Sequence, residues 1–169
     1  MSFDGSSFAL PPEVTNRGWF RNVWFHPDQS YIRNEFKCAQ SWITALDVDE
    51  GDATLAYLEG SHLHHKEFAK RFKKTDKSDW YKLENITELD FYLQKGCIPK
   101  RVKYSAGDMV FGDSRTMHCG VEAVKGRSNQ HMRAVVYVCY MPRGTSSVSK
   151  GRSKKHLLKV GLLHIGLIR

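Results

Sequence analysis

The stretch Trp24-Phe25-His26-Pro27-Asp28-Gln29-Ser30 sets one imidazole and one carboxylate two positions apart, directly after a pair of aromatic residues. On a β-strand, residues i and i+2 project from the same face, so His26 and Asp28 can hold one metal ion together. Pro27 has no N–H to give to a neighbouring strand, which predicts an edge position or the end of a strand. An H-x-D triplet also arises by chance as a surface pair, so a metal site requires a third ligand from elsewhere in the chain.

The third candidate ligand is His118, which lies far downstream at the end of a predicted strand. Two imidazoles and one carboxylate on a β-scaffold form the facial triad of non-haem Fe(II) oxygenases, which leaves open positions for substrates. Arg133 opens the last predicted strand, where its guanidinium can bind a distant carboxylate through two hydrogen bonds. This order of residues is the layout of 2-oxoglutarate-dependent oxygenases. The alternatives are a buried His118 that donates to a backbone carbonyl and an Arg133 that pairs with an acid in residues 47–52.

The rest of the chain predicts a mainly β domain over residues 1–142. Several short segments alternate or are rich in β-branched and aromatic residues, and turns separate them, which indicates a β-sandwich or barrel. Apolar residues at helical spacing predict a helical insertion around 64–95, with helices over 65–72 and 80–94. The segments predicted as strands are 36–47, 53–58, 100–104, 109–111 and 132–141.

Charge is concentrated at the C-terminal end of the 169-residue chain, whose formal net charge is +8. Seven of the 26 basic residues and none of the 18 acidic residues lie in 143–169, so residues 1–142 carry nineteen basic against eighteen acidic residues. We expect a flexible basic tail over 143–169 that can contact nucleic acid or an acidic surface. The nearly neutral body needs no such partner.

The cysteines are scattered and form no C-x-x-C pair, which argues against a zinc ribbon and favours reduced thiols in an intracellular, cytoplasmic protein. No signal peptide and no apolar run of the length of a membrane span is visible in the sequence. The four cysteines are Cys38, Cys97, Cys119 and Cys139.

Over residues 19–142 the sequence resembles the phytanoyl-CoA dioxygenase-like branch of the Fe(II)/2-oxoglutarate oxygenases. The resemblance rests on five pieces that occur in the family's order. They are residues 24–29 (WFHPDQ), 40–47 (QSWITALD), 58–62 (LEGSH), 107–118 (GDMVFGDSRTMH) and 133–135 (RAV).

The resemblance implies a double-stranded β-helix, which is a jelly-roll or cupin-like barrel, with Fe(II) bound by His26, Asp28 and His118. It implies that Arg133 binds the far carboxylate of 2-oxoglutarate and that Trp42 lies in the cosubstrate pocket, although a strand Trp is often only part of the core. The expected reaction is hydroxylation of a C–H bond of a small-molecule substrate by O2, with decarboxylation of 2-oxoglutarate to succinate and CO2.

Two departures from the family pattern keep other functions open. Gly120 stands two residues after His118, where the family commonly has a hydroxyl, and only 25 residues precede His26. The chain is therefore either a minimal form or a fragment that lacks part of the sheet. The alternatives are a cupin-like metal enzyme that does not use 2-oxoglutarate, and a truncated, non-catalytic domain that acts as a binding module.

Overall fold

The computed structural model describes residues 2–15 and 24–140. The predicted basic tail at 143–169 and the first residues of the segment that leads into the H-x-D motif lie outside the described residues. The strands are β1 (Ser2–Ala9), β2 (Ala39–Thr44), β3 (Thr54–Glu59), β4 (Ile98–Arg101), β5 (Met109–Asp113), β6 (His118–Val121) and β7 (Arg133–Tyr140). The helices are α1 (Pro12–Thr15), α2 (His65–Arg71) and α3 (Ile86–Gln94), and a 3-10 turn, Ser61–His64, precedes α2.

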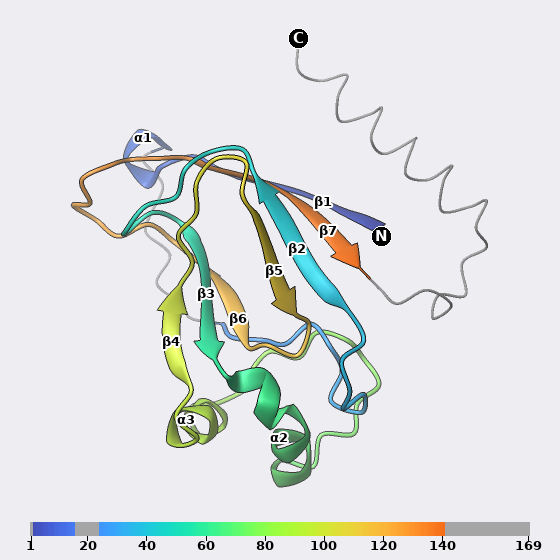
Figure 1. The fold of residues 1–169 in the computed structure, drawn as a ribbon. Coiled ribbons are helices and arrows are strands. Elements are labelled where there is room, and N and C mark those ends of the chain that lie inside the picture. Colours follow the sequence, from blue (N-terminus) through green and yellow to red (C-terminus); the bar gives the residue numbers. More distant parts are fainter. Residues whose placement is uncertain (1, 16–23, 141–169) are drawn as a thin grey trace, which may run out of the picture.

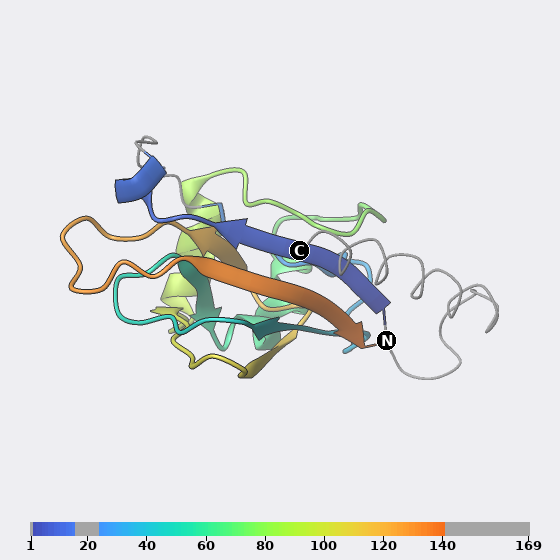
Figure 2. The same cartoon turned by 90° about the horizontal axis from the view of Figure 1, so that it is seen from above.

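The strands form two antiparallel sheets that face each other, as Figure 1 shows from the side and Figure 2 from above. One sheet has the order β1-β7-β2-β5, and the other has the order β4-β3-β6. In the first sheet Trp42 of β2 lies opposite Val110 of β5 and Tyr137 of β7. The mainly β, jelly-roll fold expected from the sequence is confirmed.

The helical insertion lies at one end of the three-stranded sheet, with α2 and α3 side by side (Figure 1). Phe68 of α2 stacks on Tyr92 of α3 with ring centroids 5.1 Å apart, and neither side chain is exposed to solvent. These rings pack with Phe25, Tyr31 and Leu58, so the insertion shares a core with the strands and the H-x-D motif.

The second helix begins at Ile86, so the prediction of a helix from residue 80 is wrong at its start. Asn85 caps the helix, because its side chain accepts a hydrogen bond from the backbone N–H of Glu88. Trp80, Tyr81 and Leu83 instead donate their backbone N–H groups to carbonyls of residues 25–28, and tertiary pairing therefore overrides their helical pattern.

A second group of buried apolar residues lies beneath the four-stranded sheet and contains Trp42, Val48, Tyr104 and Val135. The predicted strand at 100–104 is displaced, because β4 ends at Arg101 and Tyr104 forms only an isolated bridge with Val48. None of the helices in the described part of the chain is long and apolar enough to cross a bilayer.

Candidate metal centre

The H-x-D motif lies on a short extended segment that bends at Asp28. His26 forms an isolated bridge with His118, and each backbone N–H donates to the other residue's carbonyl at 2.9 and 3.0 Å. The backbone N–H groups of Asp28 and Gln29 then both donate to the Ser114 carbonyl, at 3.0 and 2.9 Å. The chain then bends at Asp28, directly after Pro27, which has no N–H with which to continue a ladder.

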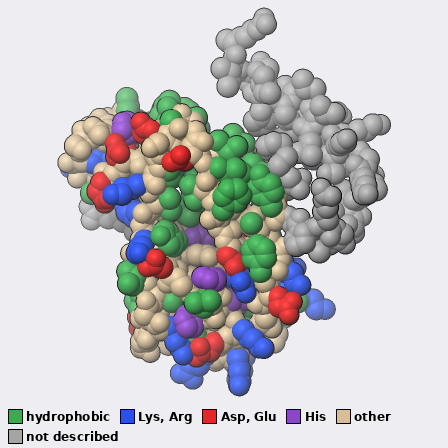
Figure 3. Space-filling model, viewed as in Figure 1, with side chains coloured by type: hydrophobic (Ala, Val, Ile, Leu, Met, Phe, Trp, Pro, Cys, Tyr) green, Lys and Arg blue, Asp and Glu red, His purple; other side chains and the backbone are tan. Residues whose placement is uncertain are grey.

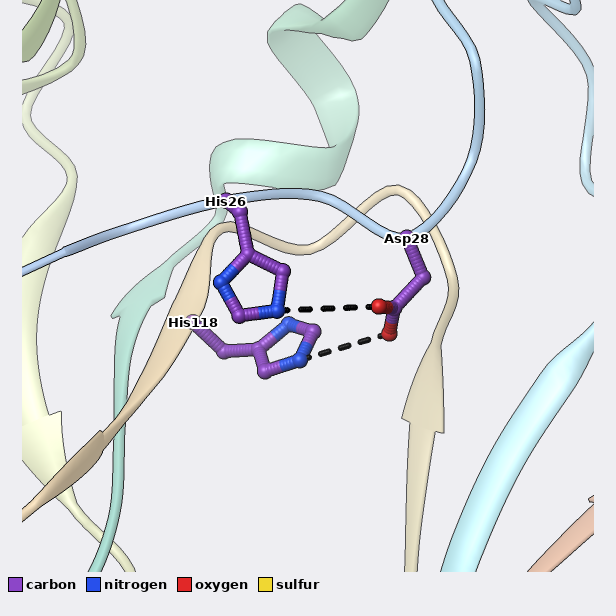
Figure 4. A group of neighbouring side chains, drawn as sticks. All are labelled: His26, Asp28 and His118. Carbon is purple, nitrogen blue, oxygen red and sulfur yellow. Dashed lines mark ion pairs between the residues drawn. The ribbon is translucent and has the colours of Figure 1, made fainter. Parts of the chain in front are cut away.

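The structure nevertheless brings the three predicted ligands to one point. The Nε2 atom of His26 lies 3.6 Å from Oδ1 of Asp28, and the Nε2 atom of His118 lies 3.3 Å from Oδ2, as Figure 4 shows. All three candidate ligand atoms lie within 4.8 Å of one another. His26 is buried, with 5% of its surface exposed, and the other two side chains are partly buried.

The backbone fixes the tautomer of both imidazoles. His26 Nδ1 lies 3.2 Å from the Trp24 carbonyl, and His118 Nδ1 lies 2.9 Å from the Thr116 carbonyl. Because a carbonyl only accepts, each Nδ1 carries the hydrogen and each Nε2 keeps its lone pair. Metal-binding histidines are typically oriented by such a hydrogen bond on the other ring nitrogen.

The electrostatics of the group favour a cation. Burial, and then the neighbouring His118, lower the pKa of His26 to about 4, against the hydrogen bond to the Trp24 carbonyl. His26 is therefore neutral at pH 7, which is the form that binds metals. Two imidazole lone pairs face the carboxylate oxygens, so the donor set fits a metal ion, and its composition suits Fe(II) with open coordination positions.

A cavity of about 810 Å³ begins at this group and continues between the two sheets. On the face of the molecule in Figure 3, histidine side chains (purple) gather near the middle of the surface. The cavity reaches Arg133, the first residue of β7. Its walls include Gln40, Trp42, Leu55, Val102, Val110 and Tyr137.

Arg133 is buried in this cavity with 8% of its surface exposed. Its Nε donates to the Tyr104 hydroxyl at 3.2 Å, and its Nη1 donates to the Tyr137 hydroxyl at 3.4 Å. Within residues 2–15 and 24–140 no carboxylate forms an ion pair with it, and Asp52, in the segment considered as its partner, binds Arg127 instead. A buried guanidinium without a carboxylate is costly, so this site favours an anionic ligand.

Trp42 points into the same cavity from β2 and is 6% exposed. Its indole Nε1 is buried, and no acceptor in the described structure takes its hydrogen. Its ring also packs edge-on against Tyr104, with centroids 6.3 Å apart. Trp42 therefore belongs to the core and also leaves an indole N–H inside the cavity.

Sequence reasoning missed the two tyrosine hydroxyls that hold Arg133. Tyr137 could have been found, because it lies four residues after Arg133 on the same strand and therefore on the same face. Tyr104 lies in a loop between β4 and β5, and no local pattern connects it to Arg133.

His65 and Asp113 lie outside the candidate metal centre, and each is held by other contacts. His65 is 1% exposed, and its Nε2 contacts the Ser30 carbonyl at 3.2 Å. It is buried because its ring stacks on Tyr31, with centroids 4.4 Å apart. The Asp113 carboxylate accepts hydrogen bonds from Arg115 at 3.0 and 2.6 Å and is thereby paired with a guanidinium.

No protein-family model matches the chain. Ava biosynthesis cluster protein O from Aspergillus versicolor is 23% identical in an alignment of 163 positions that covers 92% of this chain and 50% of that protein. AviO1 from Streptomyces viridochromogenes Tue57 superposes with a TM-score of 0.50 at 17% identity, over 85% of this chain and 51% of its own. EvdMO1 superposes with a TM-score of 0.50 at 15% identity, over 82% of this chain and 26% of its own.

The two solved structures show a shared fold at low sequence identity. A further structure, the non-haem α-ketoglutarate-dependent carbocyclase SnoK from nogalamycin biosynthesis, superposes with a TM-score of 0.47 at 22% identity, over 70% of this chain and 42% of its own. The chain spans about half of the length of the curated relative that it matches.

Proposed function

We propose that the chain forms an Fe(II)- and 2-oxoglutarate-dependent oxygenase domain of the phytanoyl-CoA dioxygenase-like type, which hydroxylates a C–H bond of a small molecule. One observation carries this proposal. A single cavity is lined both by the three candidate ligand side chains and by a buried arginine. A dicarboxylate with a 2-oxo group suits both, since it chelates a metal through the oxo acid and presents a second carboxylate to a guanidinium.

Different side chains would bind the iron and the 2-oxoglutarate. His26, Asp28 and His118 would hold the iron and leave positions open for the cosubstrates. Arg133, itself fixed by the hydroxyls of Tyr104 and Tyr137, would neutralise the far carboxylate of 2-oxoglutarate.

Trp42 and the apolar residues that line the cavity would orient the cosubstrate. Trp42 would donate its buried indole N–H to an oxygen of 2-oxoglutarate. An iron held by these residues would supply the oxidising chemistry, in which one oxygen atom of O2 goes to succinate and the other to the hydroxyl group of the product, with release of CO2. The apolar walls at Leu55, Val102 and Val110 would displace water around a bound cosubstrate and thereby strengthen its polar contacts.

The substrate class is supported by the curated relative, which carries the name of a biosynthesis cluster protein. A cavity of about 810 Å³ has the size of a small-molecule site and leaves room beside a bound dicarboxylate. We therefore propose a small organic substrate.

The proposal is tested by the formation of succinate from 2-oxoglutarate in the presence of Fe(II) and O2, with mass spectrometry of the acids. Succinate should require both iron and 2-oxoglutarate, and His26→Ala and His118→Ala should each abolish it. Asp49→Asn, in an exposed acidic loop, is the matched control and should retain activity. Turnover that survives both histidine changes contradicts the proposal.

Arg133→Ala separates this function from that of a cupin-like metal enzyme without 2-oxoglutarate. If Arg133 binds the cosubstrate, the variant should bind 2-oxoglutarate about 10- to 100-fold more weakly, as expected for a lost charge-assisted contact. Unchanged affinity in isothermal titration would favour the second enzyme class.

A further inference from the structure

The H-x-D motif has a second partner segment, residues 76–83, which we call the strap. The backbone N–H groups of Leu83, Tyr81 and Trp80 donate to the carbonyls of Phe25, Pro27 and Asp28, at 3.0, 3.2 and 3.1 Å. The motif is thus hydrogen-bonded on one side to the segment that ends at His118 and on the other side to the strap.

The strap also holds Ser30, two residues after Asp28, through two hydrogen bonds. Ser30 is fully buried; its hydroxyl donates to the Asp76 carbonyl at 2.8 Å, and its backbone N–H donates to the Asp79 carboxylate at 2.9 Å. These bonds hold both ends of the short segment that carries His26 and Asp28.

A buried carboxylate anchors the strap to α3. Glu88 of α3 is 1% exposed and accepts hydrogen bonds from the Tyr81 hydroxyl at 2.9 Å and from the Glu84 backbone N–H at 2.8 Å. Lys74, just before the strap, forms an ion pair with it at 2.8 Å. The position of the strap is therefore set by the helical insertion and not by the sheets.

Trp80 is the unusual residue of the strap. Its φ of +68° lies in the left-handed region, which bulky side chains rarely adopt and which persists where the surroundings enforce it. Its indole lies 5.2 Å from the His26 ring and 6.4 Å from Trp24. Trp24 stacks on the same imidazole at 4.7 Å.

We propose that the strap sets the geometry of the metal centre and that Trp80 is a positioning residue for His26. The left-handed backbone turns the indole onto the imidazole, so that the strained conformation is maintained by the contact it makes. This inference rests on the proposed metal centre, and it assigns to the helical insertion a role in metal binding in addition to its role in the core.

The test compares the Co(II) affinity and the stability of metal-free variants, with Co(II) followed by its visible absorption. Trp80→Gly removes the indole and relieves the backbone strain, whereas Trp80→Ala removes the indole and keeps the strain. Both should bind Co(II) about tenfold more weakly, the effect typical of a lost orienting partner of a metal ligand. Trp80→Phe should restore most of the affinity.

The matched control is Lys73→Gly, since Lys73 is the other non-glycine residue with positive φ in the described chain, at +52°. It should bind Co(II) like the wild type. Metal-free Trp80→Gly should melt at or above the wild-type temperature, which separates lost positioning from lost folding. Wild-type Co(II) affinity in both Trp80→Gly and Trp80→Ala contradicts the inference alone. If neither the wild-type protein nor Lys73→Gly binds Co(II), the proposed metal centre is contradicted, and the inference about Trp80 fails with it.

Discussion

The described structure contains two groups of acids and histidines whose atoms are close enough to share one metal ion. The first is His26, Asp28 and His118, which we call the cavity group. The second is Asp49, Asp52 and His131, which we call the loop group. They contain the same residue types, and they differ in what surrounds the carboxylate.

In the loop group, the buried Asp52 is already neutralised. Its Oδ1 accepts from Arg127 Nε at 2.8 Å, and its Oδ2 lies 3.0 Å from His131 Nδ1. Arg127 also binds both carboxylate oxygens of Glu13, at 2.7 and 3.0 Å, and so connects α1 to the loop before β3. The loop group is a structural ion-pair network.

In the cavity group, the Asp28 carboxylate faces the Nε2 atoms of two imidazoles. The Nδ1–H groups of the same rings donate to backbone carbonyls. Residue type alone therefore does not identify a metal centre. In the cavity group the two imidazole Nε2 lone pairs remain available to a cation, whereas in the loop group the buried carboxylate already pairs with a guanidinium.

The largest difference should appear in metal affinity. His118→Ala removes one of three ligands and should weaken Co(II) binding by more than about a hundredfold, beyond the range for outer-shell partners. His131→Ala should leave Co(II) affinity unchanged. Isothermal titration of both variants checks this, and equal losses would place the metal elsewhere.

In the metal-free protein, a substitution in the loop group should lower the free energy of unfolding more than a substitution in the cavity group. Asp52→Ala removes the buried carboxylate from Arg127, which keeps its ion pair with Glu13, and should lower the free energy of unfolding by about 2–3 kcal/mol. Asp28→Asn should change it by less than about 1 kcal/mol, since functional groups are often not optimised for stability. Urea unfolding curves measure both values, and a larger loss for Asp28→Asn would show that the cavity group is also structural.

The cavity group should make stability depend on pH. The folded-state pKa of His26 is about 4 and the unfolded value about 6.5, so the unfolded chain binds more protons between these values. Metal-free protein should therefore lose up to about 3 kcal/mol as the pH falls from 6.5 to 4. His26→Ala should flatten this part of the profile. A wild-type unfolding free energy that stays constant over this range contradicts the burial argument.

The smallest expected effect concerns the donor at Trp42. Trp42→Phe keeps most of the ring packing and removes one hydrogen bond, which should weaken 2-oxoglutarate binding about fivefold, or about 1 kcal/mol. Co(II) affinity should not change, because Trp42 is not a ligand. Equal binding of 2-oxoglutarate by both proteins would assign Trp42 to the core alone.

The fold class, and the residues that come together in the candidate metal centre, could be predicted because both follow from residue type and order along the chain. His26, Asp28, His118 and Arg133 carry side chains that few other roles require in that sequence, and β7 is strongly β-branched.

The local structure of the site could not be predicted, since it depends on pairings between distant segments. The spacing of apolar residues from residue 80 onward predicts the start of a helix. Backbone N–H groups of the strap instead donate to carbonyls of residues 25–28, some fifty residues earlier in the chain. The burial of His65 likewise follows from its contact with Tyr31, which no local pattern reveals.

The central claim is that one cavity binds a metal ion at the cavity group and 2-oxoglutarate between that metal and Arg133. Anaerobic titration of the protein with Fe(II) and then 2-oxoglutarate tests this most directly, through the visible metal-to-ligand charge-transfer absorption of a chelated 2-oxo acid. We predict that the band appears with saturable dependence on both components, is absent in His118→Ala, and requires more 2-oxoglutarate in Arg133→Ala. Fe(II) and 2-oxoglutarate that give no band with the wild-type protein, or the same band with His118→Ala, would contradict the account.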